Sequence, residues 1–428
     1  MKNLLLIAFI SFFSGAAVFA QDAFKDLKNA EKAIKKYVSD TNNGDELTKG
    51  IQLLESAFAS NEVMASAKSW ITKGKLLSQL AEVEMRNKTL DTEGTYVISA
   101  PNAAADAYDA FAKASTMAEK KNEKKEVQVG LGQLEQTLNN FAISAYQNKD
   151  YAGAYSNFSK TIEAAKMLSS MGKESRLNDP ALMGEQYFFT AVSAYYNKDF
   201  DNAQPYLDKL YADGSKEPFV YDALYNVNAE SDPEKALGFL AKGREMLPDD
   251  TSLLFTEINH YLKSGELNTL IGKLEMAIEK EPENVSVYNT LGSVYDQLQQ
   301  KEEDPAKSSD YRKSAESYYQ QVLDMDPKNF DATYSIGALY YNKAASYVDV
   351  LNELSADFTP AGIKKYDAKK EEMDGLFNQA LPFFEQAEGL NANDLNTVIA
   401  LKEIYARLNN LEKSNEYKAK YDKLAAER

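Results

Sequence analysis

The segment Val285–Tyr295 reads VSVYNTLGSVY. Within it, Tyr288, Leu291, Gly292 and Tyr295 are spaced three, one and three positions apart. That spacing places all four residues on one stripe of an α-helix. The three bulky groups fill space beside the glycine, where the absence of a side chain lets a second helix come close. The segment therefore predicts a helix that crosses another helix at Gly292.

The neighbouring sequence repeats this arrangement with a regular period. Pro248 and Pro282 lie 34 residues apart, and each follows an apolar run with helical spacing; a third run precedes Pro327. Proline ends a helix because it lacks an N–H donor and clashes with the preceding turn. The three runs are Ala236, Leu240, Gly243; Leu270, Leu274, Ala277; and Ala315, Tyr319, Val322.

This pattern resembles the tetratricopeptide repeat (TPR) family, in which an aromatic residue, Leu-Gly and Tyr mark one helix and a proline follows the second. The resemblance covers nearly the whole mature chain. It implies an all-α solenoid of helix-turn-helix units forming a right-handed superhelix. Each unit buries its apolar face only against its neighbours, so several must stack. We expect about eight units, with the first and last least regular.

Composition narrows the classes of function. The 428 residues are 44% hydrophobic, which indicates a folded rather than a disordered chain. A net charge of −17 argues against a nucleic-acid partner, because phosphates would be repelled. The chain has no cysteine. That excludes disulfides, thiolate metal sites, a cysteine nucleophile and a lipid anchor on an N-terminal cysteine.

The first twenty residues have the pattern of a signal peptide. Lys2 gives a positive start, residues 4–13 are apolar, and Val18-Phe19-Ala20 ends in a small residue. We expect cleavage after Ala20 and a periplasmic or secreted protein. The Ala-Gln junction resembles exported envelope proteins of the Bacteroidetes. No later apolar stretch reaches the length of a transmembrane helix, so we expect no membrane span.

The organisation expected for the mature chain has two parts. TPR-like repeats occupy residues 21–168, and a second array occupies residues 181–428. Between them, residues 169–180 are polar and are expected to form a flexible joint. Two insertions, at 299–314 and 342–379, look helical and charged, and they should lengthen helix pairs and project from one edge. The tail from Tyr417 is expected to be a capping helix.

No pattern of residues points to an enzyme or a cofactor. The chain has one histidine, His260, without an evident nucleophile or orienting group, and it lacks phosphate-binding, nucleophile-elbow and zinc-binding motifs. Acidic and amide side chains cluster around Pro327, but they lack the glycine and terminal glutamate of a calcium loop. They suit helix stops and caps. We expect no catalytic activity, cofactor or metal.

The resemblance also implies a binding face, because TPR arrays bind partners on the concave surface formed by the first helix of each unit. The register places these candidates there: Tyr146, Phe188, Tyr195, Tyr196, Tyr221, Tyr225, Phe255, Asn259, Asn289, Tyr334 and Tyr341. The basic residues that hold carboxylate tails in some members are missing. We therefore expect a protein-binding scaffold of the bacterial envelope, holding an apolar or aromatic segment of a partner in an envelope complex. The alternative is a binding protein for a small molecule or glycan, and in both cases some of these rings could only pack between repeats.

Overall fold

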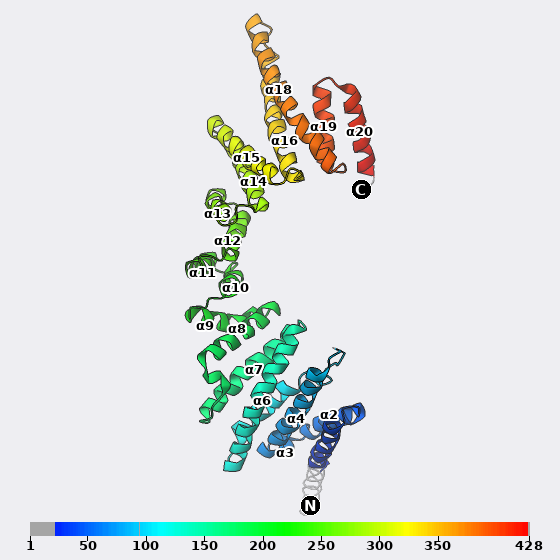
Figure 1. The fold of residues 1–428 in the computed structure, drawn as a ribbon, viewed down its shortest axis with the longest axis vertical. Coiled ribbons are helices and arrows are strands. Elements are labelled where there is room, and N and C mark those ends of the chain that lie inside the picture. The colour runs from blue at the N-terminus through cyan, green and yellow to red at the C-terminus, as the bar shows by residue number, and fades with distance from the viewer. Residues whose placement is uncertain (1–21, 94, 427–428) are drawn as a thin grey trace, which may run out of the picture. The chain divides into compact units, whose positions relative to one another are not determined.

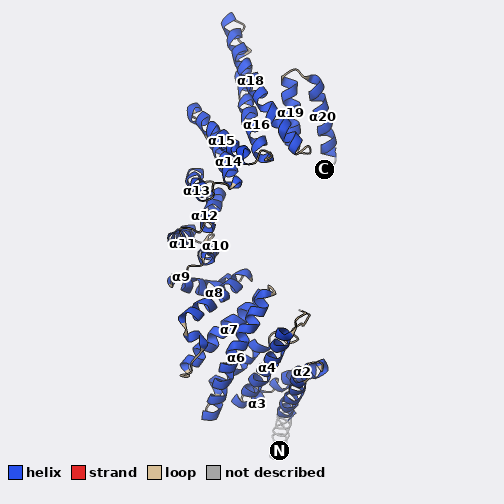
Figure 2. Cartoon of the chain, viewed as in Figure 1, coloured by secondary structure: helices blue, strands red, loops and turns tan. Residues whose placement is uncertain are grey.

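The computed structural model describes residues 22–93 and 95–426. In these residues every regular element is a helix, and loops join them (Figure 2). No helix of the described chain is both long and apolar enough to cross a membrane. The predicted signal peptide, residues 1–20, lies outside the described residues.

The chain divides into two compact units, Met1–Phe239 and Leu240–Arg428, with the division inside helix α11 (Pro233–Met246). In unit 1, residues 22–39 are helical. The further elements of unit 1 are α2 (Gly44–Phe58), α3 (Asn61–Met64), α4 (Ala67–Leu90), α5 (Ala103–Met117), α6 (Lys121–Gln147), α7 (Tyr151–Ser170), the 3-10 helix η1 (Arg176–Asn178), α8 (Pro180–Tyr196), α9 (Phe200–Ala212) and α10 (Pro218–Asn228). The elements of unit 2 are α12 (Ser252–Ser264), α13 (Leu267–Lys280), α14 (Val285–Lys301), α15 (Pro305–Met325), α16 (Phe330–Ala345), α17 (Tyr347–Leu354), α18 (Pro360–Leu390), α19 (Leu395–Arg407) and α20 (Leu411–Ala426).

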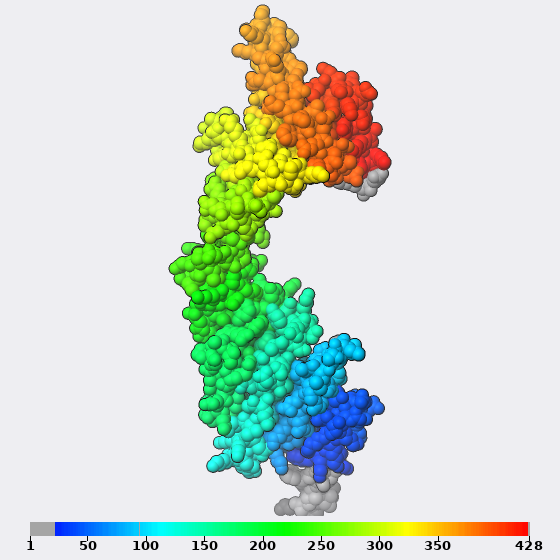
Figure 3. Space-filling model, in the orientation of Figure 1, coloured from blue at the N-terminus to red at the C-terminus, as the bar shows by residue number. Residues whose placement is uncertain are grey.

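Successive helices pack in pairs. In unit 1, α4 packs on α5, α6 on α7 and α8 on α9, while α4 also contacts α6 and α7 contacts α8 (Figure 1). Side chains close the gaps between the neighbouring ribbons of unit 1 (Figure 3). In unit 2 the pairs are α12 with α13, α14 with α15, α16 with α18 and α19 with α20. The predicted all-α array of helix-turn-helix units is confirmed.

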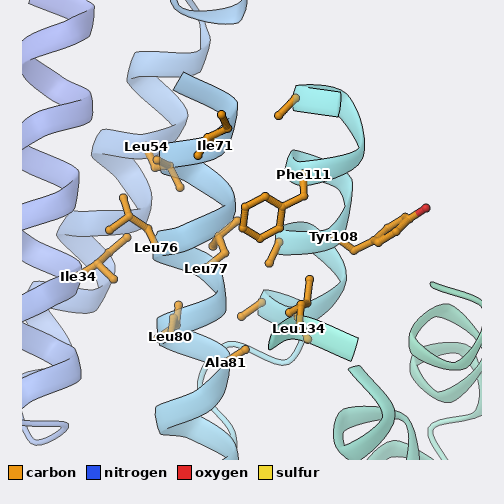
Figure 4. Close-up of a cluster of buried hydrophobic side chains, with 14 of the residues drawn as sticks. Ile34, Leu54, Ile71, Leu76, Leu77, Leu80, Ala81, Tyr108, Phe111 and Leu134 are labelled. Atoms are coloured by element: carbon orange, nitrogen blue, oxygen red, sulfur yellow. The ribbon is translucent and has the colours of Figure 1, made fainter. Parts of the chain in front are cut away.

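Glycines mark the closest crossings. A Cβ on Gly292 of α14 would lie 2.7 Å from Cε1 of Tyr319 on α15, so the crossing predicted at this glycine is confirmed. In unit 1 a Cβ on Gly74 would lie 2.9 Å from the Phe111 ring. That ring points from α5 toward Leu77 of α4 in the core cluster of Figure 4. Real Cβ atoms do not approach this closely, because interiors are close-packed.

Proline follows the second helix of the three consecutive repeats in which the period predicts it. Helix α11 ends at Met246, α13 ends at Lys280 and α15 ends at Met325, so each stops within two residues of a proline. Both insertions are helical. The first extends α14 and α15 as an antiparallel pair, and the second forms α17 and the first half of the 31-residue α18.

Two segments differ in detail from the expectation. The predicted cap is longer than expected, because α20 begins at Leu411 and packs along α19 as the second helix of a pair. The polar joint contains η1, whose Leu177 is buried, and the Ser175 hydroxyl donates to Glu135 of α6 at 2.9 Å. The predicted domain limits, 21–168 and 181–428, remain a prediction.

Candidate partner-binding surface

Two turns of unit 1 share one backbone geometry. The first joins α6 to α7 and the second joins α8 to α9. Lys149 and Lys198 occupy the same place in each turn, both at φ 60°. In each turn the aspartate that follows donates its N–H to an alanine carbonyl at 2.9 Å, Ala145 in one and Ala194 in the other. The two turns therefore present their flanking residues in the same way.

The same aspartates also begin the next helix. Asp150 accepts a hydrogen bond from the Gly153 N–H at 3.0 Å, and Asp199 accepts one from the Asn202 N–H at 3.3 Å. A side chain that accepts from these first N–H groups satisfies donors that the helix itself leaves unpaired. The first residue of each new helix is aromatic, and each preceding helix has a tyrosine in its last two residues. Hydrogen bonds thus hold both turns, and each turn is flanked by aromatic rings.

These rings contact one another from helix to helix. The Tyr146 centroid lies 5.9 Å from that of Tyr151 and 5.7 Å from that of Phe189, each edge to face. Tyr151 stacks on Tyr196 at 5.3 Å and so links α7 to the end of α8. These are the distances at which aromatic pairs attract beyond simple burial. The rings form one connected layer.

Phe219, near the start of α10, extends this layer. Its centroid lies 5.9 Å from Phe188, 5.3 Å from Tyr195 and 6.0 Å from Tyr196. Phe200 joins through Tyr195 at 5.5 Å. We name this set the aromatic surface, and its members are Tyr146, Tyr151, Phe188, Phe189, Tyr195, Tyr196, Phe200 and Phe219.

The aromatic surface is partly open to solvent. Tyr196 is 51% exposed and Phe200 is 43% exposed, while the other members are less exposed. Burial raises the pKa of Tyr146, and burial together with nearby Asp222 raises that of Tyr195. Both phenols therefore stay protonated at neutral pH. The surface offers apolar ring area and neutral hydroxyl groups.

Two more candidates in unit 1 are buried. Tyr221 is 1% exposed, its hydroxyl donates to the Ser215 carbonyl at 2.7 Å, and its ring lies against Tyr211. Tyr225 is 9% exposed. Neither offers ring area to a partner, so the structure brings together only four of the predicted residues in this unit.

The tyrosine candidates of unit 2 pack between helices. Tyr334 and Tyr341 both meet Phe384 of α18 edge to face, and the Tyr341 ring also meets Phe377. The Tyr341 hydroxyl donates to Glu403 of α19. Both rings are partly buried and pack against the core cluster of the α16–α20 region.

The other three candidates of unit 2 lie apart from one another. Phe255 is half-buried beside the apolar cluster of α12, α13 and α14, and Asn259 is exposed. The Asn289 amide donates to the Asn329 side chain at 3.3 Å, which joins α14 to the start of α16. Among the described residues, no ring layer comparable to that of unit 1 includes them.

The repeat register did not predict four members of the aromatic surface: Tyr151, Phe189, Phe200 and Phe219. Two of them had a visible signal. Residues 146–151 read YQNKDY and residues 195–200 read YYNKDF, so Tyr, Asn, Lys, Asp and an aromatic residue recur at equal spacing. The register of one helix gives no information about the residue that begins the next helix. The repeated turn sequence does, because it ends on that residue.

The described residues offer few groups suited to metal binding or acid–base chemistry. No three potential metal-ligating side chains gather in the part of the chain that the structure describes. His260 is half-buried, with its ring edge to face against Tyr261 at 5.1 Å. The acidic cluster around Pro327 acts in capping, since Asn329 accepts from the Ala332 N–H at 3.0 Å and donates to Asp326.

No family model matches the chain, and no curated protein matches it. Among solved structures, it is similar to a thermophilic TPR protein of Thermus thermophilus, with 19% identity, 51% of this chain and 88% of that one covered, and a TM-score of 0.30. It is also similar to a TPR repeats protein of Bacteroides fragilis, with 18% identity, 64% and 98% covered, and a TM-score of 0.28. Such low scores carry no argument about this chain's function.

Proposed function

We propose that this chain is a non-catalytic scaffold that binds a protein partner through the aromatic surface of unit 1. The observation that carries the proposal is the connected ring layer, in which Tyr196 is 51% and Phe200 43% exposed and hydrogen bonds hold the turns that carry them. Exposed rings that cluster on a rigid support are typical of interaction sites. Because the first twenty residues have a signal-like pattern, the proposal assigns the scaffold to a bacterial envelope.

The chemistry of the surface selects the kind of partner. Burying one ring on a partner contributes about 1.5–3 kcal/mol, and the tyrosine hydroxyls add hydrogen bonds at the rim. An apolar or aromatic segment, extended or helical, matches both properties. A nucleic acid does not, because the chain carries a net charge of −17.

Photocrosslinking tests this proposal at one position. A photoreactive phenylalanine analogue replaces Tyr196, and in a control chain it replaces Phe358, which is 85% exposed in unit 2. Light is applied to intact cells, and crosslinked proteins are identified by mass spectrometry. We expect a discrete product from position 196 that position 358 does not give. Equal or absent products at the two positions would contradict the proposal.

A further inference from the structure

The hairpin formed by α17 and the start of α18 carries apolar side chains at its free end. Phe358, in the turn between the two helices, is 85% exposed, more than any other large apolar side chain among the described residues. Ile363 is 49% exposed and Val350 is 39% exposed. We name residues 350–365 the hairpin tip. The start of α18 reaches beyond α19 and α20 of the same unit (Figure 1), so the tip is a projection. Apolar groups that gather in this way mark a contact with a protein or a membrane.

Hydrogen bonds hold the turn that carries Phe358. The Asp357 N–H donates to the Leu354 carbonyl at 3.1 Å, and the Asp357 carboxylate accepts from the Thr359 N–H at 3.0 Å. The Thr359 hydroxyl accepts from the Gly362 N–H at 3.1 Å. A Cβ on Gly362 would overlap the Asp357 side chain, so the turn is also closely packed. Phe358 therefore lies at the apex of a hydrogen-bonded, closely packed turn.

Most backbone N–H groups of this turn have partners within the hairpin. The Ser355 N–H donates to the Leu351 carbonyl at 2.9 Å, and the Ala356 N–H donates to the Glu353 carbonyl at 3.3 Å. Pro360 has no N–H, and the bonds described above pair three more of these groups. The hydrocarbon of a bilayer offers no hydrogen-bond partners, so a segment that enters it must pair these groups itself. The turn meets most of that requirement.

Two lysines follow the apolar groups of the tip. Lys364 and Lys365 are exposed, and neither forms an ion pair with another described residue, whereas Lys370 further along α18 pairs with Asp374. Lysine side chains extend from an apolar surface to the polar layer above it, where anionic lipids attract them.

The tip also holds two carboxylates, so its net charge is zero. Asp357 accepts hydrogen bonds from Thr359, which lower its pKa, and it is thus engaged within the turn. Glu353 lies on α17, the other helix of the hairpin. Apolar contact therefore supplies most of the attraction to a bilayer, and the two lysines add a preference for anionic headgroups.

Distance screens the tip from most of the acidic charge of unit 2. The chain has a net charge of −17, and the tip lies at one end of α18. With 31 residues, α18 is about 46 Å long at about 1.5 Å per residue. The Debye length in physiological salt is only about 8 Å. Charges near the far end of α18 therefore do not keep the tip away from an anionic surface.

We propose that the hairpin tip inserts Phe358 and Ile363 into the surface layer of a lipid bilayer. The two lysines then lie among the headgroup phosphates. A bilayer deforms around a projecting ring (Figure 3), whereas a protein partner would need a matching pocket, and the internally paired turn suits lipid. Such a short insertion binds reversibly.

The proposal is independent of the aromatic surface, which lies in unit 1 and shares no residue with the hairpin tip. A photoreactive group at position 358 would react with lipid, so that position still gives no discrete protein product.

Sedimentation with vesicles tests the proposal. The protein begins at Gln21, because the apolar residues 4–13 would themselves bind lipid. The vesicles are phosphatidylcholine alone, or phosphatidylcholine with one quarter phosphatidylglycerol, and we expect binding to both. Phe358→Ala should lower the partition coefficient about ten- to a hundredfold, the effect of one buried ring. Phe200→Ala, which removes an exposed ring of the aromatic surface, is the matched control and should leave the partition coefficient unchanged.

The lipid dependence of binding tests the lysines. Lys364→Gln/Lys365→Gln should weaken binding to the phosphatidylglycerol vesicles about thirtyfold, the effect of two lysines near an anionic surface. Binding to phosphatidylcholine alone should stay unchanged. An equal loss on both kinds of vesicle would contradict the placement of these lysines among the phosphates.

Fluorescence reports the surroundings of the ring. Trp70 is the only tryptophan of the chain and lies in unit 1, so Phe358→Trp combined with Trp70→Phe gives a single probe at the tip. Vesicles should shift its emission to shorter wavelength, and brominated acyl chains should quench it. Absence of vesicle binding, binding without that shift, or binding unchanged by Phe358→Ala would overturn the proposal. A shift that requires envelope membranes and is lost after protease treatment would also overturn it, because a protein would then cover the tip.

Discussion

Tyrosines in the later turns of a repeat's first helix have opposite surroundings in the two units. In unit 1, Tyr196 stacks on Tyr151 and leaves 51% of its area exposed. In unit 2, Tyr341 is held against Phe384, and its hydroxyl donates to Glu403. A place near the end of a repeat's first helix therefore does not determine whether a ring is available to a partner.

The covering helix makes the difference. The second insertion lengthens α18 and contributes Phe377, and Phe384 follows on the same helix; both rings pack against the α16 tyrosines. In unit 1, by contrast, α8 passes to α9 through a three-residue turn, and the rings at that turn contact one another. We conclude that the unit 2 rings stabilise the fold, while those of unit 1 remain available. The following predictions test that contrast.

The largest effect is expected from Phe384→Ala. This side chain is 2% exposed, and removing it leaves a cavity between two tyrosines. We expect the free energy of unfolding to fall by about 3–5 kcal/mol. Phe200→Ala in the aromatic surface, 43% exposed, should cost less than about 1 kcal/mol. Chemical denaturation followed by circular dichroism measures both, and equal losses would remove the contrast.

Deleting a single hydroxyl should have a smaller effect. Tyr341→Phe removes the donor to Glu403 and leaves the ring in place. Because the acceptor is a carboxylate, we expect a loss of about 1.5–3 kcal/mol. The matched change Tyr196→Phe should leave the unfolding free energy unchanged within experimental error. If the unfolding free energy fell in Tyr196→Phe alone, the conclusion that the unit 2 rings stabilise the fold and those of unit 1 remain available would be contradicted.

The stability of unit 2 should depend on alkaline pH. Burial, reinforced by the hydrogen bonds to Glu316 and Glu403, raises the pKa of Tyr340 and of Tyr341 from 10.0 to about 12. Since the folded chain holds these protons more tightly, their contribution is complete below pH 10 and is lost as pH rises toward 12. Denaturation midpoints at successive pH values should fall over this interval. The Tyr340→Phe/Tyr341→Phe double variant should show a shallower fall; an identical slope would contradict the account.

The smallest expected effect concerns the turns that carry the aromatic surface. Lys149 and Lys198 adopt φ 60°, which is unfavourable for any residue with a side chain. Glycine at either position should raise the free energy of unfolding by about 0.5–1 kcal/mol. Lys166→Gly, inside α7, should instead lower it by about 1 kcal/mol. Thermal denaturation tests the opposite signs, and a loss of stability in Lys149→Gly would contradict the prediction.

The sequence predicted the architecture well because its signals are local. The stripe around Gly292 specifies a crossing, and the prolines specify where helices end. It predicted the candidate surface less well, since exposure depends on distant segments. Nothing near Tyr334 in the sequence indicates that Phe384 will cover it, and only the repeated YQNKDY and YYNKDF turns pointed to Tyr151 and Phe200.

The most direct test is the affinity of the crosslinked partner, produced separately, for three full-length chains: the natural protein, the Tyr196→Ala/Phe200→Ala variant, and a control with Val97→Ala and Phe358→Ala at exposed positions elsewhere. Losing two rings should raise the Kd about a hundredfold or more, with the control unchanged. A Kd that is the same for all three chains would contradict the claim that the aromatic surface binds the partner.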